Sequence, residues 1–170
     1  MAPLAEHLFA NEGSWVQFRS WASEIAVLRN LMLSPTVERK ARSHLRLADG
    51  LMKTAEISND ASEFEIRNAF SRAYYALFHA CCAHLLATGL GTRKAEEITK
   101  DHGRLHSAMR RPMGRLFERF VREAYDRRRQ ADYEPGWPVP SATVAQGELK
   151  RARTQFYWLF NTTGQSLDRR

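Results

Sequence analysis

Apolar residues recur at steps of three and four along most of this chain, which is the spacing of one helix face. The first such stretch covers residues 14–33. A second covers residues 35–57, where Ser34 and Pro35 form a typical N-cap and first helical position. We therefore expect two helices before residue 60. The apolar stripe of the first consists of Trp15, Phe18, Ala22, Ile25, Leu28 and Met32.

The strongest helical pattern lies between Asp60 and Gly89. Asp60 and Glu63 predict a capping box at its start, and Gly89 predicts its end. Small residues at helical spacing would let a neighbouring helix approach closely, so we expect this helix at the centre of the fold. These residues are Ala69, Ala73, Ala76, Ala80 and Ala83.

Helical patterns continue at residues 102–111, 113–131 and 142–161, with Pro112 between the first two. The prolines of the segment before Ser141 exclude helix there. No alternating apolar runs flank hairpin turns, so no sheet is expected. The fold class predicted is all-α, a bundle of four or five long helices over residues 35–165 with an N-terminal helical extension at 1–34. The last helix should face inward with Val144, Leu149, Ala152, Phe156 and Leu159.

A length of 170 residues is that of one domain, with enough buried surface to fold without a metal or disulfide. Cys81 and Cys82 are adjacent and cannot bridge each other without severe strain. His102 and His106 lie one helical turn apart but lack an acidic third ligand, so no metal and no cofactor is expected. No apolar stretch is long enough to span a membrane and no signal peptide is readable, so we expect a cytoplasmic protein with no membrane partner.

Positive charge is concentrated in one part of the chain. The net charge is +7, and residues 100–130 hold ten Lys and Arg against four Asp and Glu, which is +6 of that total. A stripe of arginines on one helix face is the footprint expected for a polyanion such as RNA. The alternative is a solvated surface with no partner. The candidate RNA-binding residues are Arg111, Arg115, Arg119 and Arg122.

Arg72 and His79 stand seven residues apart on the central helix, so two turns bring them to one face about 10 Å apart along the axis. An arginine that holds a phosphate beside a histidine that exchanges protons can cleave RNA without a metal, by attack of a ribose 2′-hydroxyl on its own phosphate. The structural alternative makes His79 a hydrogen-bonded packing residue. It also pairs Arg72 with Asp132 in a buried salt bridge between two helices.

Two separated motifs in this chain resemble those of the HEPN superfamily, over about residues 40–160. The first motif, S-R-x-Y-Y-A-x-F-x-A, begins at Ser71, and an isolated histidine follows it at position 102. The second motif, R-x-x-A-D-Y, begins at Arg128. The matching residues are Ser71, Arg72, Tyr74, Tyr75, Ala76, Phe78 and Ala80 in the first, and Arg128, Ala131, Asp132 and Tyr133 in the second.

The resemblance implies an up-down four-helix bundle that forms a homodimer, and a ribonuclease of toxin–antitoxin, CRISPR or antiphage systems. Many members are encoded beside a small nucleotidyltransferase that neutralises them, which makes such an antitoxin an expected partner. The catalytic motif of the family is Arg, then four to six intervening residues, then His. Here Asp132 and Tyr133 stand after Arg128, and the pair with the family spacing lies on an earlier helix. The candidate catalytic residues are Arg72, His79, Arg128, Asp132 and Tyr133.

Two functions remain open from the sequence. One is a metal-independent endoribonuclease that acts on RNA as a toxin or antiphage component. The other is a catalytically silent HEPN module that binds a nucleotidyltransferase, a nucleotide or a nucleic acid through its arginine-rich face.

Overall fold

The computed structural model describes residues 35–88, 95 and 97–168, and the predicted helix at 14–33 lies outside these residues. Four helices are present, and no strand occurs within the described residues, so the predicted all-α class is confirmed. The helices are α2 (Pro35–Lys53), α3 (Glu63–Ala87), α5 (His102–Tyr133) and α6 (Ala142–Asp168).

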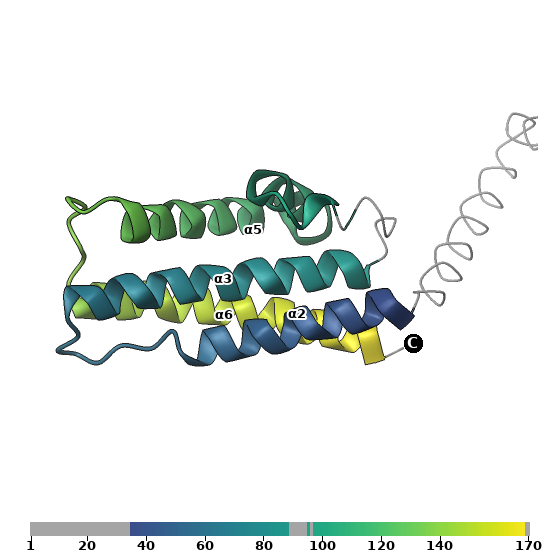
Figure 1. The fold of residues 1–170 in the computed structure, drawn as a ribbon, viewed down its shortest axis with the longest axis horizontal. Helices are drawn as coiled ribbons and strands as arrows, with labels where there is room; N and C mark the ends of the chain where they lie inside the picture. Colours follow the sequence, from purple (N-terminus) through teal and green to yellow (C-terminus); the bar gives the residue numbers. More distant parts are fainter. Residues whose placement is uncertain (1–34, 89–94, 96, 169–170) are drawn as a thin grey trace, which may run out of the picture.

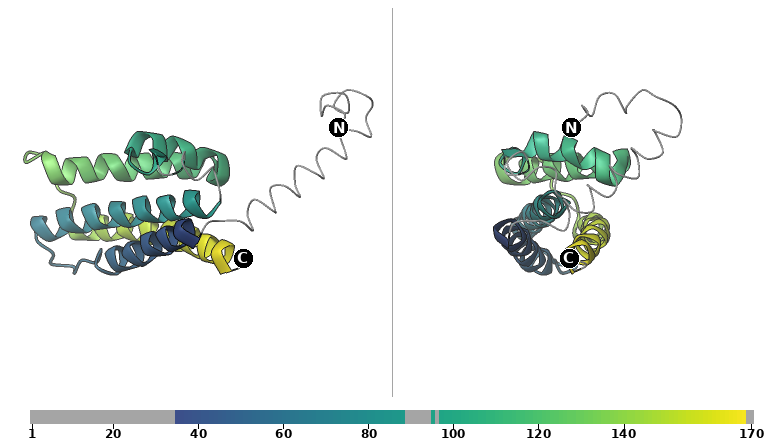
Figure 2. Two further views of the ribbon diagram at one scale, coloured as in Figure 1. Left: turned by 45° about the vertical axis from the view of Figure 1, so that its right-hand side comes forward. Right: turned by 90° about the vertical axis from the view of Figure 1, so that its right-hand side faces the viewer.

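Helix α3 is the centre of the assembly, as predicted. It packs against each of the other three helices, and α2 also contacts α6. Helix α5 lies over α3 on the side away from α2 and α6 (Figures 1 and 2). The predicted small residues of α3 are all nearly inaccessible to solvent, from Ala76 and Ala80 at 0% exposure to Ala73 at 3%. Short side chains therefore let three helices surround one.

The start of α3 differs from the prediction by two residues. Ser62, not Asp60, is the N-cap, and Glu65 completes the capping box. The Ser62 backbone N–H donates to the Glu65 carboxylate at 2.8 Å, and the Glu65 N–H donates back to Ser62 Oγ at 3.4 Å. Ser62 and Glu65 have the same three-residue spacing as the predicted pair, so the capping box is present but begins two residues later.

Helix α5 consists of two helical segments joined at Gly114, whose φ of 85° and ψ of 167° are not helical. The break predicted at Pro112 is therefore present but two residues later. The first segment folds back on the second, because Ser107 accepts a hydrogen bond from Arg122 at 2.9 Å and Arg110 pairs with Glu118 at 3.7 Å. His102 is thereby brought against Tyr125.

Helix ends are the remaining differences. The second predicted helix ends at Lys53 rather than at residue 57. Helix α6 continues to Asp168 rather than ending at residue 161, because the buried residues Thr163 and Leu167 extend its inward face. Val144 is 53% exposed, so its predicted inward position is wrong, whereas the other four predicted residues of α6 are buried. Among the described residues no helix is long and apolar enough to cross a membrane.

Candidate functional site

The two sequence motifs meet at Arg128. Its Nη2 donates to the hydroxyl of Tyr75 on α3 at 2.6 Å and to the hydroxyl of Tyr133 at 3.0 Å. The guanidinium also lies over both rings, 5.0 Å from the Tyr75 centroid and 4.9 Å from that of Tyr133. Two tyrosines therefore fix the position of this cation by hydrogen bonds and by cation–π contact.

Asp132 completes this cluster and is the counter-ion of Arg128. Its Oδ2 lies 2.7 Å from Arg128 Nε, although the N–H does not point along the contact, so the pair is ionic without a hydrogen bond. Ser71 Oγ donates to the same carboxylate oxygen at 3.4 Å. Arg128, Asp132 and Tyr133, three of the five predicted catalytic residues, are thus brought together with Ser71 and Tyr75 of the first motif.

The other two predicted residues lie elsewhere. Arg72 is exposed and donates to the backbone carbonyl of Thr54 at 3.3 Å. The predicted buried salt bridge between Arg72 and Asp132 is wrong, because Arg128, one turn before Asp132 on the same helix, occupies that carboxylate. The structure gives Arg72 and His79 no common partner among the described residues.

His79 is paired with a second histidine. Its Nδ1 lies 3.0 Å from Nδ1 of His44 on α2, so one ring donates and the other accepts. Burial, followed by the neighbouring His44, lowers the pKa of His79 to about 4. His79 is therefore a neutral ring that joins α2 to α3 at neutral pH.

A second polar cluster surrounds Tyr74, which is 1% exposed. The Tyr74 hydroxyl lies 2.5 Å from His102 Nδ1 and 3.2 Å from His106 Nε2. The His102 ring stacks on Tyr125 with centroids 5.3 Å apart and contacts Phe78 at 4.5 Å. The one-turn spacing of His102 and His106 was visible in the sequence, but their shared partner 28 and 32 residues away was not.

Burial sets the charge of this second cluster. It lowers the pKa of His106 to about 4 and raises that of Tyr74 well above its usual range. The pKa of His102 is also lowered, first by burial and then by the positive charge of Arg128, while Asp101 opposes the shift. At neutral pH the cluster is uncharged. Within the described residues no group of three or more metal-ligating side chains occurs.

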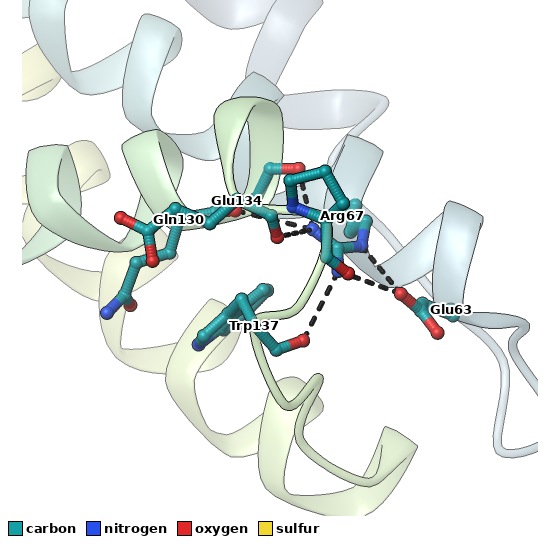
Figure 3. Close-up of polar contacts among 7 residues, drawn as sticks. Glu63, Arg67, Gln130, Glu134 and Trp137 are labelled. Atoms are coloured by element: carbon teal, nitrogen blue, oxygen red, sulfur yellow. Dashed lines mark hydrogen bonds and ion pairs between the residues drawn. The ribbon is translucent and has the colours of Figure 1, made fainter.

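Arg67 holds the end of α5 in place and was not singled out from the sequence (Figure 3). Its Nη1 donates to the carbonyls of Gln130, Ala131 and Glu134 at 3.3, 3.0 and 3.1 Å. Its Nη2 donates to the carbonyls of Pro135 and Trp137 at 3.3 and 3.2 Å, and its Nε donates to Glu63 at 2.8 Å. These contacts fix the turn that carries Asp132 and Tyr133.

The predicted arginine stripe is interrupted. Arg111 precedes Gly114 and the other three follow it, so they do not share one continuous helix face. All four are exposed. Arg119 pairs with Glu123 at 3.5 Å and Arg122 pairs with Glu118 at 3.0 Å. Arg111 and Arg115 have no acidic side chain within 4 Å in the described part of the chain.

No family model matches this chain, and no solved structure matches it. The chain is similar to a protein of Methanocaldococcus jannaschii named "Putative toxin MJ0605". The two are 26% identical over 108 residues, which cover 64% of this chain and 78% of that protein.

Proposed function

We propose that this protein is a toxin that acts as a metal-independent endoribonuclease of HEPN type. The observation that carries the proposal is the Arg128 cluster, in which the two motifs of the HEPN resemblance meet in space. The name of the Methanocaldococcus relative supports the toxin role. The clustered positive charge of α5 supports RNA as the substrate.

In this proposal Arg128 binds the scissile phosphate and stabilises the charge that develops on the phosphorane. Tyr75, Tyr133 and Asp132 orient its guanidinium. Tyr133 is 66% exposed at the end of α5, so its side chain has room to move when a phosphate approaches. Arg72 and His79, the other two candidates from the sequence, contact Thr54 and His44 rather than the Arg128 cluster, and the proposal assigns neither of them a step in the reaction.

The proposed partners are RNA, a second copy of the chain and a nucleotidyltransferase antitoxin. Arg111, Arg115, Arg119 and Arg122 would contact the RNA backbone. Apolar side chains left on the surface support association with another protein, because Leu116 is 74% and Trp158 50% exposed. The homodimer and the antitoxin are both expectations from the HEPN resemblance.

A catalytically silent module is the second candidate, and one observation favours it. Arg128 is only 8% exposed, and three side chains of its own protein occupy its guanidinium. A structural arginine would have the same contacts. In that case the protein binds RNA or the antitoxin without cleaving.

Incubation of the purified protein with total tRNA, with and without EDTA, tests the proposal. Cleavage should persist in EDTA and leave a 2′,3′-cyclic phosphate end. Arg128→Gln should reduce the rate by at least about 100-fold, the size found for loss of one charge-stabilising donor. Arg129→Gln, which removes an exposed charge at the next position, should leave the rate within about twofold.

The outcomes separate the two candidates. tRNA binding without cleavage by the wild-type protein would establish the silent module. If the protein neither binds nor cleaves tRNA, the proposal is overturned and a purely protein-binding role remains. Thermal unfolding of both arginine variants must show that they remain folded.

A further inference from the structure

His102 lies on the same side of α5 as Arg128. The His102 ring stacks on Tyr125. Tyr125 precedes Arg128 by three residues on the same helix, so Tyr125 and Arg128 lie on one helix face. From α3, Tyr74 contacts His102 and its neighbour Tyr75 holds Arg128, with the two tyrosine rings 5.6 Å apart. The fold at Gly114 therefore brings His102 near enough to Arg128, the proposed phosphate-binding residue, for the arginine's charge to lower the pKa of the histidine, although 26 residues separate them in the sequence.

We infer that His102 is the proton acceptor of the proposed ribonuclease and that Tyr74 positions its ring. The inference rests on the proposed function and gives His102 the proton-transfer role that the sequence suggested for His79. His102 is half-buried, with its Nδ1 held by Tyr74, which leaves Nε2 as the nitrogen that can meet a substrate.

The hydrogen bonds around Tyr74 are compatible with the tautomer that such a base requires. A hydroxyl has one proton, so Tyr74 donates to one of its two histidines and accepts from the other. When it donates to His106 Nε2, it accepts from His102 Nδ1–H, and His102 Nε2 then carries the free lone pair. In this arrangement a buried acceptor of the Nδ1 proton orients the ring of a catalytic histidine.

His79 lacks these properties. Its Nδ1 is occupied by a second imidazole rather than by an oxygen, and two protonated rings 3.0 Å apart would repel each other. A ring whose pKa is lowered to about 4 is a weak base at neutral pH. The His44–His79 pair therefore serves the packing of α2 against α3.

The proposed step balances in protons and bonds. His102 Nε2 takes the proton of the ribose 2′-hydroxyl, the 2′-oxygen forms a bond to phosphorus, and the bond from phosphorus to the 5′-oxygen breaks. The leaving 5′-oxygen takes a proton from water, and the imidazolium neutralises the hydroxide that remains. The products are a 2′,3′-cyclic phosphate and a 5′-hydroxyl end.

The charges around His102 give the reaction its pH dependence. The groups that face the ring are Tyr74 on α3, His106 and Tyr125 on α5, Arg128, and Asp101 at the helix N-cap. Arg128 lowers the pKa of His102 and Asp101 raises it. A base must be unprotonated, so the rate falls as the pH drops through this pKa. Asp101→Asn removes the opposing charge and should move that acid limb to lower pH.

The test uses a fluorescent single-stranded oligoribonucleotide and the full-length protein. His102→Ala should reduce cleavage at least about 100-fold, within the range for loss of a general base, and leave the RNA Kd within about twofold. Added imidazole should restore part of the rate in His102→Ala, which loss of a merely structural ring would not allow. His79→Ala is the matched control and should keep cleavage within about threefold.

A second measurement tests the role of Tyr74 without relying on cleavage. Nitrogen NMR of the His102 ring should show the Nδ1–H tautomer in the wild type and a mixture of tautomers in Tyr74→Phe. An Nε2–H tautomer in the wild type would overturn the positioning role. Full cleavage by His102→Ala, or loss of cleavage in His79→Ala alone, would overturn the assignment of His102. Absence of cleavage in the wild type would instead refute the proposed function.

Discussion

The guanidinium of Arg67 donates hydrogen bonds to five backbone carbonyl groups at the end of α5 and in the loop that follows. The last carbonyls of a helix have no partner within the helix and carry its negative partial charge. A cation at this position satisfies both requirements. Stacking on Trp137, with the guanidinium 5.3 Å from the ring centroid, adds a contact that covers the end of the core.

Arg67→Ala should lower the free energy of unfolding by at least about 2 kcal/mol, because it leaves the carbonyls of Ala131 and Trp137, in partly buried contacts, without this donor. Arg67→Lys should recover little of the lost free energy of unfolding. One ammonium cannot reproduce the planar guanidinium, whose two Nη atoms bind separate sets of carbonyls. Urea denaturation measures both. Arg72→Ala removes an exposed arginine with a single carbonyl contact and should cost less than about 0.5 kcal/mol. Equal losses in Arg67→Ala and Arg72→Ala would contradict the role given to Arg67.

Single residues of the site were predictable by type but not by partner. The R-x-x-A-D-Y motif identified Arg128, Asp132 and Tyr133, and they do lie together. The rule that buried charges find partners predicts a pair between Asp132 and Arg72. That rule does not say whether Arg72 or Arg128 lies nearer to the carboxylate. The sequence spacing of Arg128 and Asp132, one helical turn, held that information.

At the scale of elements, the fold of α5 depends on one glycine. Gly114 has φ 85° and ψ 167°, a conformation that side-chain-bearing residues rarely adopt. No atom lies within 4 Å of where a Cβ would stand, so the constraint is on the backbone and not on space. This turn brings His102 to Tyr125.

Gly114→Ala should therefore cost about 1–3 kcal/mol from backbone strain alone. Gly147→Ala is the matched control, because Gly147 lies inside α6 with equally open surroundings and ordinary helical backbone. That variant should be stabilised by about 0.5–1 kcal/mol. The midpoint temperature of thermal unfolding should fall in Gly114→Ala and rise in Gly147→Ala. A stabilised Gly114→Ala would mean that α5 continues straight through this position.

The existence of the elements followed from periodicity, whereas the turn between the two parts of α5 did not. Pro112 is the stronger breaker by type, yet it stays helical, while Gly114 two residues later leaves the helical region. The capping boxes at Asp60 and Ser62 show the same limit. The three-residue rule fits both pairs, and the structure forms the box at Ser62 and Glu65.

For the whole molecule, the pattern of small residues was sufficient to place α3 at the centre. The pattern could not show that α5 packs mainly against α3 and folds back on itself, because both depend on contacts between residues far apart in the sequence. The Tyr74–His102 contact, on which the inferred proton acceptor rests, is one of these. Distant contacts of this kind are what a single sequence leaves undetermined.

The interruption of the arginine stripe changes the expected behaviour of the whole surface toward RNA. Arg119 and Arg122 already pair with carboxylates, so a phosphate must displace Glu123 or Glu118 before it can bind either arginine. Arg111 and Arg115 face no acidic side chain within 4 Å among the described residues, so a phosphate can bind them without that exchange. If the protein binds RNA as proposed, the two pairs of arginines should therefore contribute unequally to the salt dependence of binding.

Replacing Arg111 and Arg115 together by Gln should flatten the plot of log Kd against log salt by about 0.7 for each phosphate that the protein no longer neutralises, the value for single strands. Replacing Arg119 and Arg122 together should flatten it less. Fluorescence anisotropy of a labelled oligoribonucleotide at several salt concentrations measures the slopes. The control is Arg39→Gln with Arg46→Gln, which removes the same net charge from exposed positions on α2. Equal flattening in all three double variants would show that overall charge, rather than this part of α5, binds the RNA.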